Sequence, residues 1–128
     1  MSRRNRRLLS IGPWSLDSDS AVKRQILSDE CGQNGWELIC PTNIADDNDR
    51  EIKEWLTTIA DATLVLVDLS LERPSCYYEL GCVETMKKTV AVIARSGTPI
   101  HQTFQRDTVI FYDGLVDYRR VVHCLVCS

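Results

Sequence analysis

Two carboxylates, Asp68 and Glu79, are the residues of this sequence best placed for chemistry. Asp68 ends an otherwise apolar run, and Glu79 follows a turn from which a helix should start. A nucleophile at the anomeric carbon of a sugar must be an ionised, fixed carboxylate, because it meets positive charge in an oxocarbenium-like transition state. We therefore predict Glu79 and Asp68 as catalytic residues.

Each carboxylate also has a purely structural interpretation. Asp68 could cap the turn that follows it by accepting hydrogen bonds from the backbone of residues 69–71. With Ser75 as the N-cap, Glu79 lies just past the capping-box position, where the helix dipole favours its anion and it could simply stabilise its own helix. Gly81 indicates close packing against another segment or a ligand, because an interior helical glycine costs about 1 kcal/mol.

Polar and glycine-rich loops supply candidate substrate contacts. Gly12-Pro13 forms a turn whose backbone can approach a ligand closely, although no phosphate-binding loop with a following Lys-Ser/Thr is present. Ser15 could donate to a hydroxyl or a phosphate, and His101 lies in a polar loop where it could contact substrate or donate a proton. The candidate substrate-binding residues are Gly12, Pro13, Trp14, Ser15, Ser70, Ser75, Tyr78 and His101.

The elements that must position these residues alternate along the chain. Apolar runs at 8–11, 36–40, 62–69, 90–94 and 109–112 predict strands, and amphipathic spacing at 22–31, 46–61, 76–86 and 115–126 predicts helices. The largely apolar run at 62–69, which includes β-branched residues, is typical of a strand covered on both faces, so it should be the most central one. This order predicts an α/β fold, a three-layer doubly wound sandwich with a mostly parallel five-stranded sheet, flavodoxin-like or Rossmann-like. Ligands bind such sheets at the carboxyl ends of the strands, which selects the loops 12–15, 68–78 and 95–106.

Length and charge limit the possible classes of protein. The 128 residues, 44% of them hydrophobic, fit a single domain over 8–128, preceded by a basic arm over 1–7 that we expect to be disordered. The net charge of −3 and the absence of a nucleic-acid module argue against a nucleic-acid partner. No apolar run approaches the roughly 20 residues that a membrane-spanning helix needs. Without an export signal, we expect a cytoplasmic location and no membrane partner.

The six cysteines favour free thiols in a reducing compartment. Cys124 and Cys127 form a Cys-x-x-Cys pair beside His123 that could in principle bind zinc or cycle redox. A zinc site needs four ligands, and no second pair has matching spacing. We expect buried cysteines at helical spacing there, with no metal and no cofactor.

The segments 60–70, 73–81 and 88–90 carry a family resemblance. They read Ala-Asp-Ala through Val-Asp-Leu-Ser, then Arg-Pro-Ser-Cys-Tyr-Tyr-Glu-Leu-Gly, then Lys-Thr-Val, and together with Gly12-Pro13 and residues 111–114 they resemble the nucleoside 2-deoxyribosyltransferases and the related nucleoside 5′-monophosphate N-glycosidases. The resemblance implies the same doubly wound fold, a nucleoside or nucleotide substrate, and a homo-oligomer with sites near subunit interfaces. It also implies that Glu79 attacks the anomeric carbon to form a glycosyl-enzyme, with Asp68 at the rim and Gly12-Pro13 beside the sugar or its phosphate.

Residues 73–76 depart from the transferase pattern. Transferases of this family usually carry an aspartate shortly before the glutamate, where it helps to protonate the base, whereas this chain has Arg-Pro-Ser-Cys. Hydrolysis is therefore expected rather than base transfer. The helix also resembles that of TIR-like nucleotide-binding modules of signalling and defence systems, some of which cleave NAD and some of which only bind. Residues 97–106 followed by 109–113 fit that group at least as well, which makes it the alternative.

Overall fold

The computed structural model describes residues 6–41, 52–101 and 108–127. Its strands are β1 (Arg6–Ile11), β2 (Trp36–Ile39), β3 (Leu64–Asp68), β4 (Val90–Arg95) and β5 (Ile110–Tyr112). Its helices are α1 (Ser20–Gln33), α2 (Ile52–Asp61), α3 (Pro74–Thr85) and α4 (Leu115–Val126), with a short 3-10 turn, η1 (Ser70–Glu72), before α3. The strands form one parallel sheet in the order β2-β1-β3-β4-β5, which confirms the predicted α/β class and the central place of the third strand.

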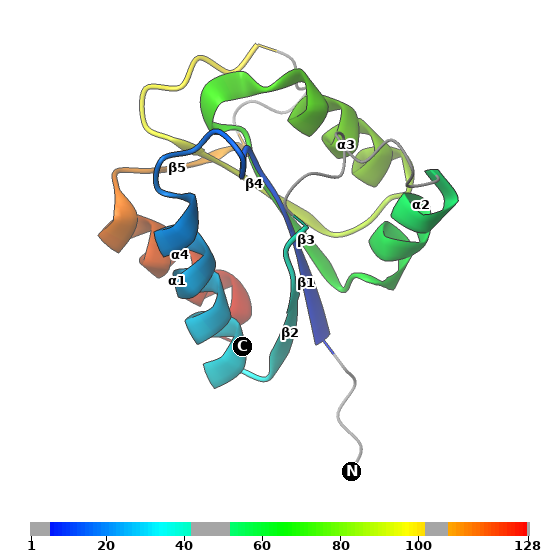
Figure 1. Cartoon of the computed structure of the whole chain (residues 1–128), viewed down its shortest axis with the longest axis horizontal. Helices are drawn as coiled ribbons and strands as arrows, with labels where there is room; N and C mark the ends of the chain where they lie inside the picture. The colour runs from blue at the N-terminus through cyan, green and yellow to red at the C-terminus, as the bar shows by residue number, and fades with distance from the viewer. Residues whose placement is uncertain (1–5, 42–51, 102–107, 128) are drawn as a thin grey trace.

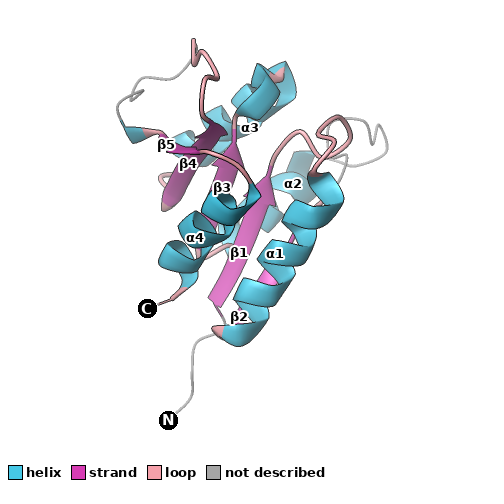
Figure 2. Ribbon diagram, turned by 90° about the vertical axis from the view of Figure 1, so that its left-hand side faces the viewer, coloured by secondary structure: helices cyan, strands magenta, loops and turns pink. Residues whose placement is uncertain are grey.

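Helices cover both faces of the sheet. Figure 1 looks along the sheet, with α1 and α4 on its left and α2 and α3 on its right, and Figure 2 shows α1 and α4 together in front of the strands. Val65 and Val67 of β3 pack in the core with α2 and α3, whereas Leu64 and Leu66 pack in the core with α1 and α4. Because strand side chains alternate between faces, one apolar run supplies both cores.

The two helices α1 and α4 are joined by a buried carboxylate. Glu30 of α1 is only 5% exposed, and its side chain lies 2.7 Å from His123 Nδ1 and 3.1 Å from an Arg119 nitrogen, both on α4. The hydrogen bond with His123 and that with Arg119 lower the pKa of Glu30, although burial acts in the opposite direction. These contacts of Glu30 therefore hold α4 against α1.

The first strand begins earlier than predicted. Arg6 and Arg7 were assigned from the sequence to a disordered arm, but they belong to β1, where they lie in register with Trp36 and Glu37 of β2. The Arg7 side chain lies 3.3 Å from Glu37 Oε1. Residues 1–5 of the predicted arm, residues 46–51 of the predicted second helix and residues 102–106 of the predicted loop lie outside the described residues.

The start of α3 corrects two expectations. Its N-cap is Arg73 and not Ser75, with Pro74 at the first helical position, where a proline fits because that residue needs no N–H. Glu79 consequently lies in the second turn of the helix. Gly81 was expected to pack closely, but a Cβ atom at Gly81 would meet no atom within 4 Å, so this glycine opens no space for a neighbour.

The structure also gives the exposure of the cysteines and the length of the helices, which the sequence had led us to predict. All six cysteines are free, but Cys124 and Cys127 are exposed, so the prediction that they are buried was wrong. The described part of the chain contains no cluster of three or more His, Cys, Asp or Glu side chains that could hold a metal ion. Within the same residues, no helix is long and apolar enough to cross a membrane.

Candidate active site at the carboxyl ends of the strands

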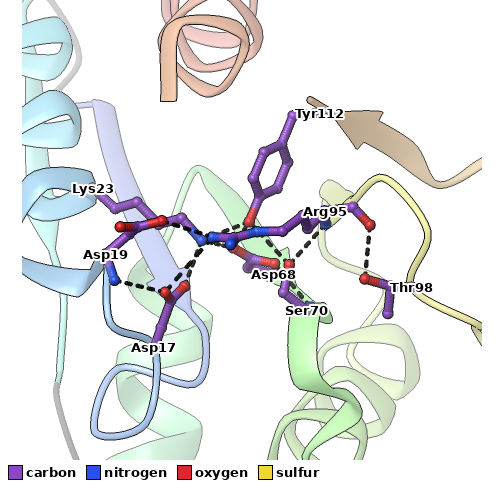
Figure 3. A network of polar contacts seen from close by, with 8 residues as sticks. All are labelled: Asp17, Asp19, Lys23, Asp68, Ser70, Arg95, Thr98 and Tyr112. Atoms are coloured by element: carbon purple, nitrogen blue, oxygen red, sulfur yellow. Dashed lines mark hydrogen bonds and ion pairs between the residues drawn. The ribbon is translucent and has the colours of Figure 1, made fainter. Parts of the chain in front are cut away.

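The carboxyl ends of β3, β4 and β5 meet in one polar network. Asp68, Arg95 and Tyr112 are the last residues of these three strands, and Figure 3 shows them together with Ser70 and with residues from the start of α1. Parallel strands end at one edge of a sheet, so residues far apart in the sequence become neighbours there. This edge is where the sequence predicted the site.

Lys23 of α1 is the centre of this network. It is 1% exposed, and its Nζ lies 2.5 Å from Asp17 Oδ2, 3.2 Å from Asp68 Oδ2 and 2.6 Å from the Tyr112 hydroxyl. The ammonium also lies 4.9 and 5.3 Å from the ring centroids of Tyr112 and Tyr118. Burial acts to lower the pKa of Lys23, but the charge of Asp68 and the hydrogen bond to Asp17 outweigh it and raise that pKa. Lys23 is therefore a fully charged, fully paired cation inside the fold.

Asp68 is held by three donors. Its Oδ2 accepts from Lys23 and from the Tyr112 hydroxyl at 2.8 Å, and its Oδ1 accepts the backbone N–H of Ser70 at 2.9 Å. The bond to Ser70 is the turn-capping interaction that the sequence offered as its structural alternative. Asp68 is only 4% exposed, so its carboxylate is held inside the fold by these donors. Its part in catalysis stays a prediction.

Ser70 and Arg95 extend the network to a small hollow. Ser70 Oγ accepts the backbone N–H of Arg95 at 2.8 Å and lies 2.9 Å from the Tyr112 hydroxyl. The Arg95 guanidinium lies 3.0 Å from Asp19 Oδ2 and 3.7 Å from Asp17 Oδ1. A hollow of about 160 Å³ opens beside them, lined by Leu16, Asp17, Ser18, Ser70, Leu71, Arg95 and Thr98.

The loop after β1 lies against Asp68. A Cβ atom at Gly12 would be 3.4 Å from the Cβ of Asp68 and 3.6 Å from the Trp14 ring, so the two strand ends are in contact. Pro13 is buried, and Trp14 is 7% exposed with its Nε1 donating to the Ser10 carbonyl at 3.4 Å. Trp14 packs in the core beside α1, and Ser15 is exposed. Gly12 is thus the residue of this loop that the structure brings to Asp68.

Glu79 differs from the other carboxylates of this edge. It is 7% exposed and forms no hydrogen bond or ion pair with any residue that the structure describes. Burial therefore acts unopposed and raises the pKa of Glu79 to about 7. The sequence predicted an anion stabilised by the helix dipole, but Glu79 lies in the second turn, beyond the range of that effect. Near neutral pH this side chain is about half protonated.

The thiol of Cys76 is affected by both candidate catalytic carboxylates. Burial raises the pKa of its thiol to about 12, and the charges of Glu79 and then Asp68 act in the same direction. Both carboxylates must lie near this sulfur to have that effect. Cys76, one helical turn before Glu79, consequently stays a neutral thiol.

The remaining predicted contacts lie at the start of α3 and in the loop after β4. Ser75 is half-buried in the first turn of α3, and Tyr78 is 59% exposed. His101 is exposed, and its backbone N–H and its Nδ1 each lie 3.1 Å from Glu72 Oε1. The same Glu72 oxygen accepts a hydrogen bond from the Tyr77 hydroxyl at 2.7 Å. Glu72 therefore links His101 to the first turn of α3.

Sequence reasoning missed six members of the network, namely Asp17, Asp19, Lys23, Arg95, Thr98 and Tyr112. Lys23 carried a usable signal, because it shares helical spacing with Ile26, Leu27, Glu30 and Cys31 on the buried face of α1. A lysine on an apolar stripe must find buried acidic partners. Of its partners, Asp17 lies in the loop before α1, whereas Asp68 and Tyr112 end the strands β3 and β5, so local spacing does not pair them with Lys23.

Solved structures share this fold. The CMP N-glycosidase BcmB of Clostridium botulinum is similar over 91% of this chain and 98% of its own, with a TM-score of 0.65 and 14% identity. The β-glucosidase EmGH1 of Erythrobacter marinus is similar over 96% of this chain and 25% of its own, with a TM-score of 0.62 and 14% identity. A fungal multi-domain GH3 β-N-acetylglucosaminidase with a GCN5-related glucosamine N-acetyltransferase region is similar over 98% of this chain and 14% of its own, with a TM-score of 0.64 and 11% identity. The sequence matches no protein-family model and no curated protein. The likeness establishes an α/β fold shared with an N-glycosidase.

Proposed function

We propose that this protein hydrolyses the N-glycosidic bond of a nucleoside or nucleotide, with Glu79 as nucleophile. The observation that carries the proposal is the isolation of Glu79, a buried carboxylate without a described partner, whose pKa of about 7 leaves it partly ionised at neutral pH. Strongly perturbed pKa values cluster at catalytic sites. The fold shared with a CMP N-glycosidase supports the same reaction class.

In the first step, an ionised Glu79 oxygen bonds to the anomeric carbon while the bond from that carbon to the base nitrogen breaks. The base leaves with the electron pair and takes a proton from water, which leaves a hydroxide ion. In the second step, water attacks the anomeric carbon, the bond to Glu79 breaks and the carboxylate is restored, and the proton lost by the attacking water neutralises that hydroxide. Only the ionised fraction of Glu79 can begin this cycle.

Water is the preferred acceptor because no acidic residue precedes Glu79 on α3 to serve a leaving or entering base. Cys76 stands where an acidic residue would be useful, but its pKa of about 12 makes it a poor proton donor. Asp68 has its oxygens occupied by Lys23, Tyr112 and the backbone of Ser70. Hydrolysis therefore fits these residues better than base transfer does.

A second candidate function is a TIR-like module that binds a nucleotide or NAD in the same crevice, with or without cleaving NAD. The hydrogen bonds of Asp68 favour this candidate. Because both oxygens of Asp68 already accept bonds from Lys23, Tyr112 and the Ser70 backbone, Asp68 is not available as a second catalytic carboxylate beside Glu79. Either function would be served by a homo-oligomer, as the sequence resemblance implies.

Incubation with nucleosides, nucleoside 5′-monophosphates and NAD separates the candidates. Free base detected by chromatography would support the hydrolase. Thermal stabilisation by a nucleotide with no product supports the binding module, because a ligand that binds only the folded state raises its stability. Neither product nor stabilisation across the panel would reject both.

A further inference from the structure

The hollow beside Arg95 is too small for a whole nucleotide. Its volume is about 160 Å³, whereas pockets that enclose a drug-sized ligand measure roughly 300–1,000 Å³. Its walls come from the loop after β1 and from the ends of β3 and β4, the edge where this class of sheet binds ligands. One group of a larger ligand would fit there.

Two exposed leucines line this hollow from different loops. Leu16 follows β1 and is 54% exposed, and Leu71 follows β3 and is 56% exposed. Neither is buried by the described part of the chain, so both present apolar surface at the hollow. A ligand group with an apolar face would cover them.

The backbone under Leu71 is strained. Its φ is 70° and that of Glu72 is 46°, a left-handed conformation that glycine adopts freely and that leucine rarely does. Surrounding bonds impose the turn, since Asp68 accepts the Ser70 N–H and Glu72 donates its own N–H to the Leu69 carbonyl at 2.9 Å. The fold thus holds a solvent-exposed leucine in an unfavourable conformation at the mouth of the hollow. Strain of this kind is concentrated at ligand sites.

The polar wall of the hollow selects a neutral group. Arg95 is partly exposed, but its charge already faces Asp19 at 3.0 Å and Asp17 at 3.7 Å. A phosphate in the hollow would meet those two carboxylates as well as the guanidinium. A neutral, flat group with acceptor atoms on its edge avoids that repulsion and still accepts from the guanidinium N–H groups.

We propose that this hollow is the nucleobase subsite, in which Leu16 and Leu71 contact the faces of the base and Arg95 donates to its carbonyl edge. The inference rests on the proposed function, since it assigns one part of the proposed substrate. The hollow and Glu79 flank the same strand end, because Ser70 and Leu71 directly follow β3 and Glu79 lies in α3, the next helix along the chain.

The test substitutes Leu71→Gly, with Lys87→Gly as the matched control. Lys87 is exposed, has a φ of 56° at the end of α3 and does not line the hollow. Both substitutions relieve the same kind of backbone strain. Glycine also makes the unfolded chain more flexible, so we expect at most a small and similar decrease in Tm for the two variants. Only Leu71→Gly should raise KM for nucleotide cleavage, by about tenfold, because it removes apolar contact with the base.

Equal KM values for the two variants would overturn the subsite. If the wild type cleaves no nucleotide, the proposed function fails and the subsite is tested by calorimetric titration with cytidine and adenosine 5′-monophosphates. A Kd weakened about tenfold in Leu71→Gly but not in Lys87→Gly then supports the subsite. Equal Kd values, or no binding to the wild type, reject it.

Discussion

Lys23 Nζ lies 3.2 Å from Asp68 Oδ2, which joins α1 to the end of β3 across the buried edge of the sheet. Asp17 and Tyr112 complete the shell around the ammonium, so four segments of the chain meet at one cation. The loops that border Gly12 and Ser70 are fixed by this arrangement. Glu79, without a described partner, depends on this scaffold for its surroundings.

Replacing Lys23 with methionine should strongly destabilise the fold. The change leaves the buried carboxylates of Asp17 and Asp68 without their cation, and breaking a buried pair on one side costs about 3–5 kcal/mol. The free energy of unfolding in urea measures it. Lys53→Met on the exposed face of α2 is the control and should stay within about 0.5 kcal/mol of the wild type. A loss below about 1 kcal/mol in Lys23→Met would contradict the central role of this cation.

Glu79→Gln should stabilise the protein at alkaline pH. The folded-state pKa of Glu79 is about 7, raised by burial from an ordinary value of 4.5, so the folded state holds a proton that the unfolded chain loses. The wild type therefore loses stability as pH rises from about 4.5 through 7, by up to about 3 kcal/mol, and glutamine does not titrate. Urea unfolding at pH 4, 6 and 8 measures the difference. A constant difference between the two proteins across this range would show that Glu79 titrates normally.

The rate of hydrolysis should rise with pH through about 7. Only ionised Glu79 attacks the sugar, and with this pKa about one tenth of the molecules are ionised at pH 6 and about nine tenths at pH 8. The profile of kcat/KM between pH 5 and 9 gives the apparent pKa of the free enzyme. A rate that falls over the same range would indicate that the protonated carboxyl acts instead, as a general acid.

The cysteines should differ sharply in reactivity. Burial raises the pKa of Cys31 to about 11 and that of Cys76 to about 12, so both remain protonated thiols inside the fold, whereas Cys124 and Cys127 are exposed. Brief treatment of the native protein with iodoacetamide, mapped by mass spectrometry, should label the two exposed cysteines first. Labelling of Cys76 at the rate of Cys124 would mean that its helix opens readily.

The alternating pattern of the sequence was sufficient to predict the sheet and its helices. The helix over 115–126 begins and ends where it was predicted, because Gly114 precedes an amphipathic stretch without interruption. The start of α3 was misplaced, although Pro74 is a recognised signal for the first helical position. Local propensities therefore carried most of the architecture.

The site itself depended on contacts that the sequence does not encode locally. Asp68 and Tyr112 are 44 residues apart, and their hydrogen bond exists because β5 lies next to β4 at the same edge of the sheet. Asp68 could be predicted as a site residue from its place at the end of a strand. That Lys23, Tyr112 and the Ser70 backbone donate to it could not be predicted. The raised pKa of Glu79 likewise depends on burial by tertiary packing, which no local pattern reports.

The most direct test of the account compares free-base release by the wild type, Glu79→Gln and Glu84→Gln. Glu84 is an exposed glutamate of the same helix, so its variant controls for a change of charge on α3. Removing the nucleophile should reduce kcat on the order of a thousandfold in Glu79→Gln, with the fold intact, and leave Glu84→Gln near the wild-type rate. Base release by Glu79→Gln at the wild-type rate would contradict the assignment of Glu79 as the nucleophile.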